Sequence, residues 1–442
     1  MNLDELRSAV QHESIDTVVI AIPDMQGRLV GKRLMATHFL DEVLPHGAEG
    51  CNYLLATNVE MMPVEGYAMS SWDLGYGDFM MIPDIRTLRR LPWLEATALC
   101  IADVQWENGD PVAASPRGIL QRQLDRLAER GWTANVGTEL EFLIFNNTYE
   151  DAWQRAYRDL TPANLYNTDY SLAGTARIEE FIRKIRNSMV GAGMRVENSK
   201  GECNLGQHEI NFRYTDALRM ADDHVVYKSG AKEIASLEER AISFMAKWDE
   251  REGNSCHIHL SLARDDGSNV FAADEGTFNR FLAGQLDCLR ELCLFFAPNI
   301  NSYKRFVPGA FAPTAVAWGH DNRTCAMRVV GHGEGKRLEN RLPGADVNPY
   351  LAIAAMIAAG LHGIDSNLDL EPAFDGNAYE SEKARVPQNL RDAQELFAQS
   401  AVAREAFGEE VVSHYVNAAQ VELDAFDRAI TDWEKFRGFE RL

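Results

Sequence analysis

The apolar and polar positions of the first hundred residues predict one helix followed by short strands. Leu3, Leu6, Ala9 and Val10 fall on one face of a helix that opens the chain. Residues 17–22 are β-branched and apolar, the turn sequence Pro-Asp-Met-Gln-Gly follows, and the strand pattern resumes over 28–33, which predicts a hairpin. Further short strand patterns run to about residue 104. These patterns predict a small α+β domain over residues 1–108.

The turn cluster Asn-Gly-Asp-Pro at 108–111 marks the predicted start of a second domain, over 109–442. Helical periodicity covers a segment that ends at Gly131 and four later segments, 217–247, 277–296, 348–362 and 405–435. Strand patterns cover 134–145, 208–214, 255–262, 325–330 and 337–342. Because helices and strands do not alternate regularly, we expect a mixed α+β domain rather than a parallel βαβ sheet.

Two acidic residues stand where a core strand is expected. Glu139 and Glu141 are two residues apart in the segment 137–145, so their side chains point to the same face of the strand. Two carboxylates on one buried face repel each other and raise each other's pKa unless a cation neutralises them. A sheet face that is wetted by solvent would also explain the pair, and this segment alone leaves both interpretations open.

Three further segments repeat this arrangement. His257, His259 and Ser261 share one face of a predicted strand whose other face is aliphatic. Arg337, Glu339 and Arg341 alternate along another strand, and Glu202 and Glu209 flank the entry to a third. Together these segments predict a polar cavity that is lined by carboxylates, imidazoles and guanidinium groups.

The residue types in this cavity indicate phosphoryl-transfer chemistry. Carboxylates with one or two imidazoles suit Mg²⁺ or Mn²⁺, whereas structural zinc sites use paired cysteines. Arginine is the preferred clamp for carboxylate and phosphate groups. The candidate arginines are Arg305, Arg323, Arg328, Arg337 and Arg341. Divalent cations beside several arginines can neutralise the charge of a transferring phosphoryl group.

Composition and charge limit the classes of partner. The chain has 442 residues and a net charge of −22, which disfavours nucleic acid and anionic membrane surfaces as partners. Seven cysteines, an odd number with no C-x-x-C pair, indicate a reducing compartment. The N-terminus has no apolar signal core, and the longest apolar run, 351–361, is too short to span a bilayer. We therefore expect a cytoplasmic protein.

Seven motifs in order resemble the glutamine synthetase family of type I. They lie at 77–84, 137–141, 206–209, 254–261, 301–305, 322–328 and 337–349. The resemblance implies a small N-terminal β-grasp domain and a catalytic domain with a curved antiparallel sheet flanked by helices. It also implies a dodecamer of two hexameric rings, with each active site shared between neighbouring subunits. The implied substrates are ATP and L-glutamate, with Mg²⁺ or Mn²⁺ as the metal.

The resemblance also assigns a role to each candidate residue. The ligands of the first metal are Glu141, Glu202 and Glu209, and those of the second metal are Glu139, His257 and Glu339. The residues that hold glutamate are Gly253, Arg305 and Arg341. The residues at the transferring phosphate are Arg323 and Arg328, and the nucleotide contacts are His259, Ser261, Arg328 and Arg337.

The sequence departs from the family at the nitrogen site. The family has an acid six residues after the arginine of the Asn-Ser-Tyr-Lys-Arg motif, and this position is Phe311 here. An aspartate of the family's N-terminal domain has no counterpart in the nearest stretch, 50–55. Bare ammonium needs negative groups to replace its hydration, whereas an aromatic ring suits an organic amine. We therefore expect a ligase that joins glutamate to an amine such as ethanolamine or a polyamine, with Phe311 in the substrate site.

The residue that takes the proton of the amine is open; Glu60 and Glu65 are candidates. A third departure is Glu252, where the family usually has asparagine beside the glutamate. Three other functions stay open from sequence: a true glutamine synthetase that uses ammonium, a non-catalytic member of the family, and a two-metal hydrolase. All six predicted metal ligands are present, which argues against the non-catalytic form. The number of arginines argues against the hydrolase.

Overall fold

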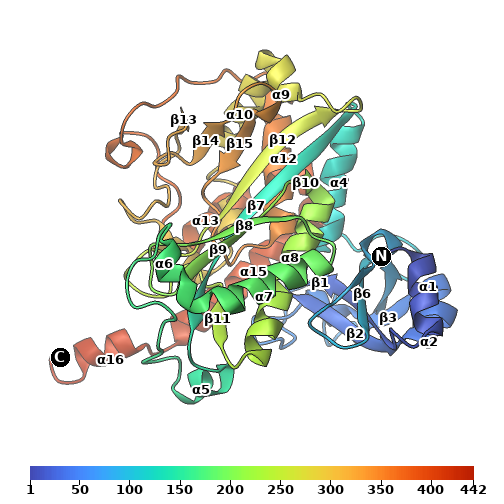
Figure 1. Ribbon diagram of the computed structural model, residues 1–442. Coiled ribbons are helices and arrows are strands. Elements are labelled where there is room, and N and C mark those ends of the chain that lie inside the picture. Colours follow the sequence, from blue (N-terminus) through green and yellow to red (C-terminus); the bar gives the residue numbers. More distant parts are fainter.

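The computed structural model describes residues 1–442 and contains two β-sheets, each with its own helices (Figure 1). The first sheet uses strands between residues 17 and 105, and the second uses strands between residues 132 and 340. The mixed α and β architecture with flanking helices confirms the expected fold class. The predicted boundary between 108 and 109 falls between the last strand of the first sheet, which ends at Gln105, and helix α4, which begins at Pro116.

The first sheet has the strand order β2-β1-β6-β4-β3, and β5 also pairs with β6. The strands are β1 (Thr17–Pro23), β2 (Leu29–Met35), β3 (Ala48–Cys51), β4 (Asp78–Pro83), β5 (Arg89–Arg90) and β6 (Thr97–Gln105). The predicted hairpin is confirmed as the antiparallel β1–β2 pair, whereas β1 and β6 run parallel. Helix α1 (Leu3–Gln11) begins with a capping box between Asn2 and Glu5, and it buries Leu6 and Ala9.

The second sheet is built around two long central strands, β7 (Trp132–Phe145) and β12 (Cys256–Arg264). Its order is β13-β14-β15-β12-β7-β9-β8, and all pairs except β13–β14 are antiparallel. The other strands are β8 (Val196–Gly201), β9 (Gln207–Phe212), β10 (Thr215–Asp216), β11 (Ala241–Ser243), β13 (Trp318–His320), β14 (Met327–Val330) and β15 (Arg337–Asn340). This order places the acidic strands β7, β9, β12 and β15 next to one another.

Helices pack against this sheet and form the core with it. The longer ones are α4 (Pro116–Ala128), α7 (Glu179–Gly191), α8 (Ala217–Leu237), α10 (Glu275–Cys288), α12 (Pro349–Asp365), α13 (Leu390–Gln399) and α15 (Glu409–Arg428). Nearly every residue of α12 is buried, which explains why its sequence is apolar on all sides. No helix is both long and apolar enough to cross a membrane.

Three predicted helices are wrong in length. The helix expected over 217–247 ends at Leu237, because Glu239 turns the chain with a φ of 53° and residues Ala241–Ser243 pair with β7 as strand β11. The segment 405–435 is divided among α14 (Ala401–Phe407), α15 and α16 (Asp432–Gly438), and Gly408, with a φ of 88°, separates the first two. The segment 277–296 likewise contains α10 and the short α11 (Cys293–Phe296).

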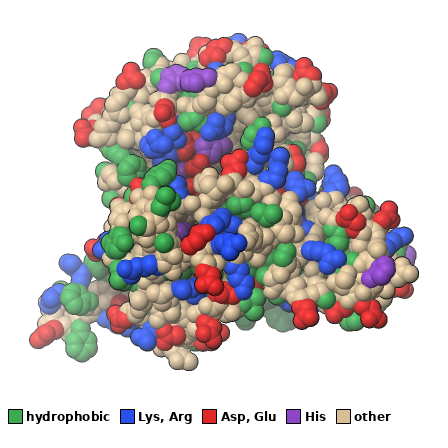
Figure 2. All heavy atoms as spheres, in the orientation of Figure 1, with side chains coloured by type: hydrophobic (Ala, Val, Ile, Leu, Met, Phe, Trp, Pro, Cys, Tyr) green, Lys and Arg blue, Asp and Glu red, His purple; other side chains and the backbone are tan.

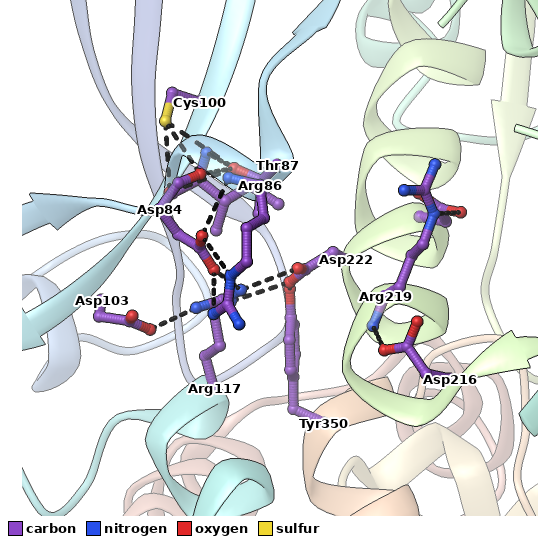
Figure 3. A network of polar contacts seen from close by, with 12 residues as sticks. Asp84, Arg86, Thr87, Cys100, Asp103, Arg117, Asp216, Arg219, Asp222 and Tyr350 are labelled. Atoms are coloured by element: carbon purple, nitrogen blue, oxygen red, sulfur yellow. Dashed lines mark hydrogen bonds and ion pairs between the residues drawn. The ribbon is translucent and has the colours of Figure 1, made fainter. Parts of the chain in front are cut away.

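Buried ion pairs join the two parts of the chain (Figure 3). Arg117 of α4 donates to Asp84 at 2.7 Å and to Asp222 of α8 at 3.0 Å, and it also contacts Asp103 of β6. The hydroxyl of Tyr350 donates to Asp222 at 2.6 Å. The Arg117 side chain is only 2% exposed, so its contacts with the buried Asp84 and Asp222 are shielded from water and fix the first sheet against α4 and α8.

Candidate active site

Four neighbouring strands of the second sheet place their acidic and histidine side chains opposite one another. The cross-strand pairs are Glu139 with His257, Glu141 with Glu209, and Glu339 with His259. Residues directly opposite on antiparallel strands have Cβ atoms about 5 Å apart. The i, i+2 pattern seen in the sequence therefore produces one continuous polar surface that crosses β9, β7, β12 and β15.

The polar surface contains two groups of possible metal ligands. Atoms of Glu141, Glu202 and Glu209 all lie within 4.8 Å of one another, and so do atoms of Glu139, His257 and Glu339. These are the two trios that the sequence predicted. The first trio holds only carboxylate oxygens, and the second adds one imidazole, which is the donor set that Mg²⁺ and Mn²⁺ accept.

The first trio is electrostatically strained without a cation. Burial, with the nearby Glu209 carboxylate, raises the pKa of Glu141 to about 7. Burial also raises the pKa of Glu209, although Lys200 opposes this rise. Lys200 contacts Glu202 and lies 3.7 Å from Glu209. A divalent cation would relieve this repulsion far more than one lysine, so the residues fit a metal.

The second trio has the opposite electrostatics. Burial opposes ionisation of Glu139, but hydrogen bonds from His257 and His259 outweigh it and hold the pKa of Glu139 below its usual value. His257 Nδ1 lies 3.4 Å from Glu139 and 3.5 Å from Glu339. Burial lowers the pKa of His257 to about 4, so its imidazole is neutral near pH 7 and can donate a lone pair to a metal.

Two cavities open on this surface and share Glu139 and Asn211 as lining residues. The larger, of about 600 Å³, is lined by the predicted nucleotide contacts His259, Ser261 and Arg337. The smaller, of about 270 Å³, is lined by both trios together with Gly253, Phe311, Arg323, Arg328 and Arg341. Acidic, basic and histidine side chains gather in the hollow between the upper and lower parts of the molecule (Figure 2). All but one of the residues to which the family resemblance assigned a role thus line two adjoining cavities.

Two arginines of the smaller cavity are held by Glu339. Arg341 donates to Glu339 at 2.5 Å and to the carbonyl oxygen of Phe311 at 3.3 Å, and Arg328 donates to Glu339 at 2.7 Å. Arg328 also contacts Asp321. The Nε atom of Arg341 is buried and has no hydrogen-bond partner, so this donor is left unsatisfied in the protein.

Arg305 is the predicted site residue that does not line either cavity. Its guanidinium donates to the carbonyl oxygens of Arg341 at 2.9 Å and Leu342 at 2.8 Å, and to Ser255 Oγ at 3.3 Å. It thus supports the strand end that carries Arg341. Glu60 and Glu65, the sequence candidates for the amine's proton, line neither cavity.

The sequence patterns missed several lining residues. Lys200 lies in β8, two residues before Glu202, and pairs with Glu209 of β9. The two-residue spacing of polar side chains that revealed the other strands could therefore have revealed Lys200 as well. Asp169 and Tyr170 also line the smaller cavity, but they belong to an irregular segment without periodicity. Cys203 lines the cavity as well, and burial together with Asp169 raises its pKa to about 11, so this thiol is not a thiolate nucleophile near pH 7.

Comparisons with known proteins agree with this geometry. Residues 113–437 match the glutamine synthetase catalytic domain. The chain is 63% identical to the gamma-glutamylethanolamide synthetase GlnA4 of Streptomyces coelicolor, over 100% of this chain and 96% of that protein. It is 35% identical to a glutamate–isopropylamine ligase of a Pseudomonas species, over 98% of this chain and 97% of that protein.

A solved structure described as a GmaS/ADP complex superposes with a TM-score of 0.87 at 28% sequence identity, and the match covers 98% of this chain and 99% of that one. The family match covers well over half of the residues, and both relatives align along nearly their whole length. The chain therefore belongs to the glutamine synthetase family.

Proposed function

We propose that this protein is an ATP-dependent ligase that joins an organic amine to the γ-carboxylate of L-glutamate. The observation that carries the proposal is the pairing of two intact ligand trios with an aromatic residue, Phe311, in the wall of the same cavity. The names of the two relatives, whose acceptors are ethanolamine and isopropylamine, support an organic acceptor here. Ethanolamine or a polyamine is the acceptor that we propose.

The first step forms an activated acid. A γ-carboxylate oxygen of glutamate attacks the γ-phosphorus of ATP, the bond to the β-phosphate oxygen breaks, and γ-glutamyl phosphate and ADP result. Arg341 would hold the carboxylate, and Gly253 would lie beside the substrate. Arg323 and Arg328 would neutralise the charge on the transferring phosphoryl group.

The second step forms the amide. The amine, as its free base, attacks the carbonyl carbon of γ-glutamyl phosphate through its nitrogen, the bond from this carbon to the phosphate oxygen breaks, and inorganic phosphate and a proton leave. The nucleotide would occupy the larger cavity beside His259, Ser261 and Arg337. Because the cavities share Glu139, the end of the triphosphate and the acid to be activated would meet there. Arg305 would act by holding the backbone of Arg341 in place.

Mg²⁺ or Mn²⁺ would be held by the two trios and would supply charge neutralisation for the phosphates and the carboxylate. Glu141, Glu202 and Glu209 form one site, and Glu139, His257 and Glu339 form the other. His259 Nε2 contacts Glu139 at 2.9 Å and orients this carboxylate.

A panel of acceptors tests the proposal. Phosphate release is measured with glutamate, ATP and Mg²⁺ in the presence of ammonium, ethanolamine, putrescine, spermine or isopropylamine. We expect at least one organic amine to exceed ammonium in kcat/KM. Ammonium above every amine would identify a true glutamine synthetase instead.

Variants of Phe311 test the role of the aromatic residue. Its side chain is 56% exposed, so replacement should leave the fold intact. Phe311→Glu should lower kcat/KM for the best organic amine about tenfold and raise the use of ammonium, because a carboxylate replaces the ring. Phe311→Leu, the matched control, keeps an apolar wall and should retain most amine activity. Equal behaviour of both variants would remove Phe311 from the acceptor site.

We also propose that the protein is a cytoplasmic homo-oligomer, a dodecamer of two hexameric rings. Helix α16 projects from the body of the subunit near the C-terminus (Figure 1). Its region exposes Trp433, Phe436, Phe439 and Leu442. An exposed apolar cluster of this kind marks a protein-interaction surface. All seven cysteines are free, which supports a reducing compartment. Light scattering after size-exclusion chromatography should give the mass of twelve subunits, and a monomer would contradict the assembly.

A further inference from the structure

Part of the smaller cavity wall lies outside both ligand trios. This part consists of Asp169, Tyr170, Cys203, Glu252 and Phe311. It borders the first trio, because an oxygen of Asp169, the sulfur of Cys203 and an oxygen of Glu202 lie within 4.8 Å of one another. An acceptor that attacks glutamate in this cavity would extend toward this wall.

The position of Asp169 is fixed by its neighbours. The Tyr170 N–H donates to the carbonyl oxygen of Gly201 at 3.4 Å, and a Cβ atom at Gly201 would lie only 2.4 Å from the carbonyl oxygen of Thr168. Glycine at 201 therefore allows this segment to run directly against the end of β8. The Cys203 thiol faces Asp169 Oδ2 at 3.7 Å. Asp169 has no salt-bridge partner in the structure, and its side chain is exposed toward solvent.

Two aromatic rings line this wall beside Asp169, Cys203 and Glu252. Tyr170 and Phe311 are 74% and 56% exposed, and both backbones adopt left-handed conformations, with φ of 53° and 55°. Lys200 Nζ lies over the Tyr170 ring, 5.0 Å from the ring centroid. An acceptor with a short carbon chain would place its methylene groups against rings and its far end against a carboxylate. The same cavity is lined by the buried Arg341, whose Nε atom has no hydrogen-bond partner.

We infer that Asp169 is a specificity-determining residue that binds the polar group at the far end of the acceptor. This inference rests on the proposed ligase function. A hydroxyl at that end donates a hydrogen bond to the Asp169 carboxylate, and a second ammonium group forms an ion pair with it. A methyl group can do neither. The acceptor class is therefore an amino alcohol or a diamine rather than a simple alkylamine.

Ethanolamine and propylamine test this inference because they have the same length and differ only at the end far from the amine, where ethanolamine has a hydroxyl and propylamine has a methyl group. In the wild-type protein we expect kcat/KM for ethanolamine to exceed that for propylamine about tenfold or more, since a hydrogen bond to a charged group is lost. Asp169→Ala should remove this difference by lowering the ethanolamine value, with propylamine unchanged within about twofold. The KM values for ATP and glutamate should stay at those of the wild-type protein.

Asp169→Asn is the conservative variant. Its amide oxygen still accepts a hydrogen bond from a hydroxyl, but it carries no charge. We expect it to retain most activity with ethanolamine and to lose about tenfold in kcat/KM with putrescine. This variant keeps the inference falsifiable if Asp169→Ala does not fold. Asp159→Asn, on the same segment but outside the cavity, is the matched control and should behave as the wild-type protein.

The outcomes separate the two proposals. The inference would be overturned if Asp169→Ala lowered kcat/KM equally for ethanolamine and propylamine. It would also be overturned if Asp169→Asn lowered kcat/KM equally for ethanolamine and putrescine. Neither result would affect the proposed ligase function. Turnover of ammonium without turnover of any amine by the wild-type protein would overturn both.

Discussion

The buried network at Arg117 gives the sharpest prediction about stability. Arg117→Met replaces the guanidinium with an apolar side chain of similar length. Asp84 keeps its contact with Arg86 at 2.8 Å, but Asp222, whose side chain is 4% exposed, keeps only the Tyr350 hydroxyl (Figure 3). Removal of one partner from a buried ion pair costs about 3–5 kcal/mol, because a charge is left without compensation.

The expected shift in melting temperature follows from the size of the chain. Unfolding of 442 residues has an entropy of roughly 0.9 kcal/mol/K near the melting temperature. A loss of about 3–5 kcal/mol therefore lowers the melting temperature by about 3–5 °C. Differential scanning calorimetry of both proteins at pH 7 and equal concentration measures this shift.

A second variant separates lost charge compensation from lost packing. Arg117→Met with Asp222→Asn removes the charge that the first change leaves unpaired, so it should recover part of the lost melting temperature. A melting temperature of Arg117→Met within about 1 °C of the wild-type value would show that the lost ion pair leaves no costly buried charge. A double variant that is less stable than Arg117→Met would lead to the same conclusion.

Three further predictions concern acid stability, metal binding and the nucleotide. Burial opposes ionisation of Asp84, but the contacts with Arg86 and Arg117 outweigh burial and lower the pKa of Asp84 to about 2. The ionised carboxylate therefore contributes its full stabilisation above the unfolded-state pKa of 3.8, and this stabilisation is lost as the pH falls toward 2. The melting-temperature difference between wild type and Asp84→Asn should therefore narrow from about pH 5 to about pH 3; a constant difference would contradict this. After EDTA treatment to remove metal, added Mn²⁺ should raise the melting temperature of the wild-type protein, and it should raise that of the double variant Glu141→Gln/Glu209→Gln much less. Equal shifts in the two proteins would argue against this metal site. Arg337→Ala should raise the KM for ATP about tenfold and leave that for glutamate unchanged, and an unaltered ATP KM would place the nucleotide elsewhere.

The sequence predicted the acidic surface well because strand geometry depends on local spacing. Glu139 and Glu141 point to one face through the two-residue period of a strand, and the structure places them opposite His257 and Glu209. Which residues of two strands lie opposite each other depends on long-range pairing, which the spacing within one strand does not determine. The division of the ligands into two trios therefore came from the resemblance to the family's motifs.

Other features depended on contacts that no local pattern reports. The helix predicted to reach residue 247 stops at Leu237 because Ala241–Ser243 pairs with β7, a strand about a hundred residues earlier. Arg305 belongs to a family motif, but its guanidinium supports the backbone of Arg341 rather than lining the cavity. Asp169 reaches the cavity through an irregular segment packed on Gly201, so only the folded structure brings it to the site.

A competition reaction between ammonium and ethanolamine decides which acceptor the protein prefers. The wild-type protein is incubated with ATP, Mg²⁺, glutamate and equal concentrations of ammonium and ethanolamine, and both products are measured by mass spectrometry. The product ratio equals the ratio of the two kcat/KM values at equal acceptor concentrations. The account predicts mainly γ-glutamylethanolamide, with one ADP and one phosphate for each amide formed. Glutamine as the main product would contradict it.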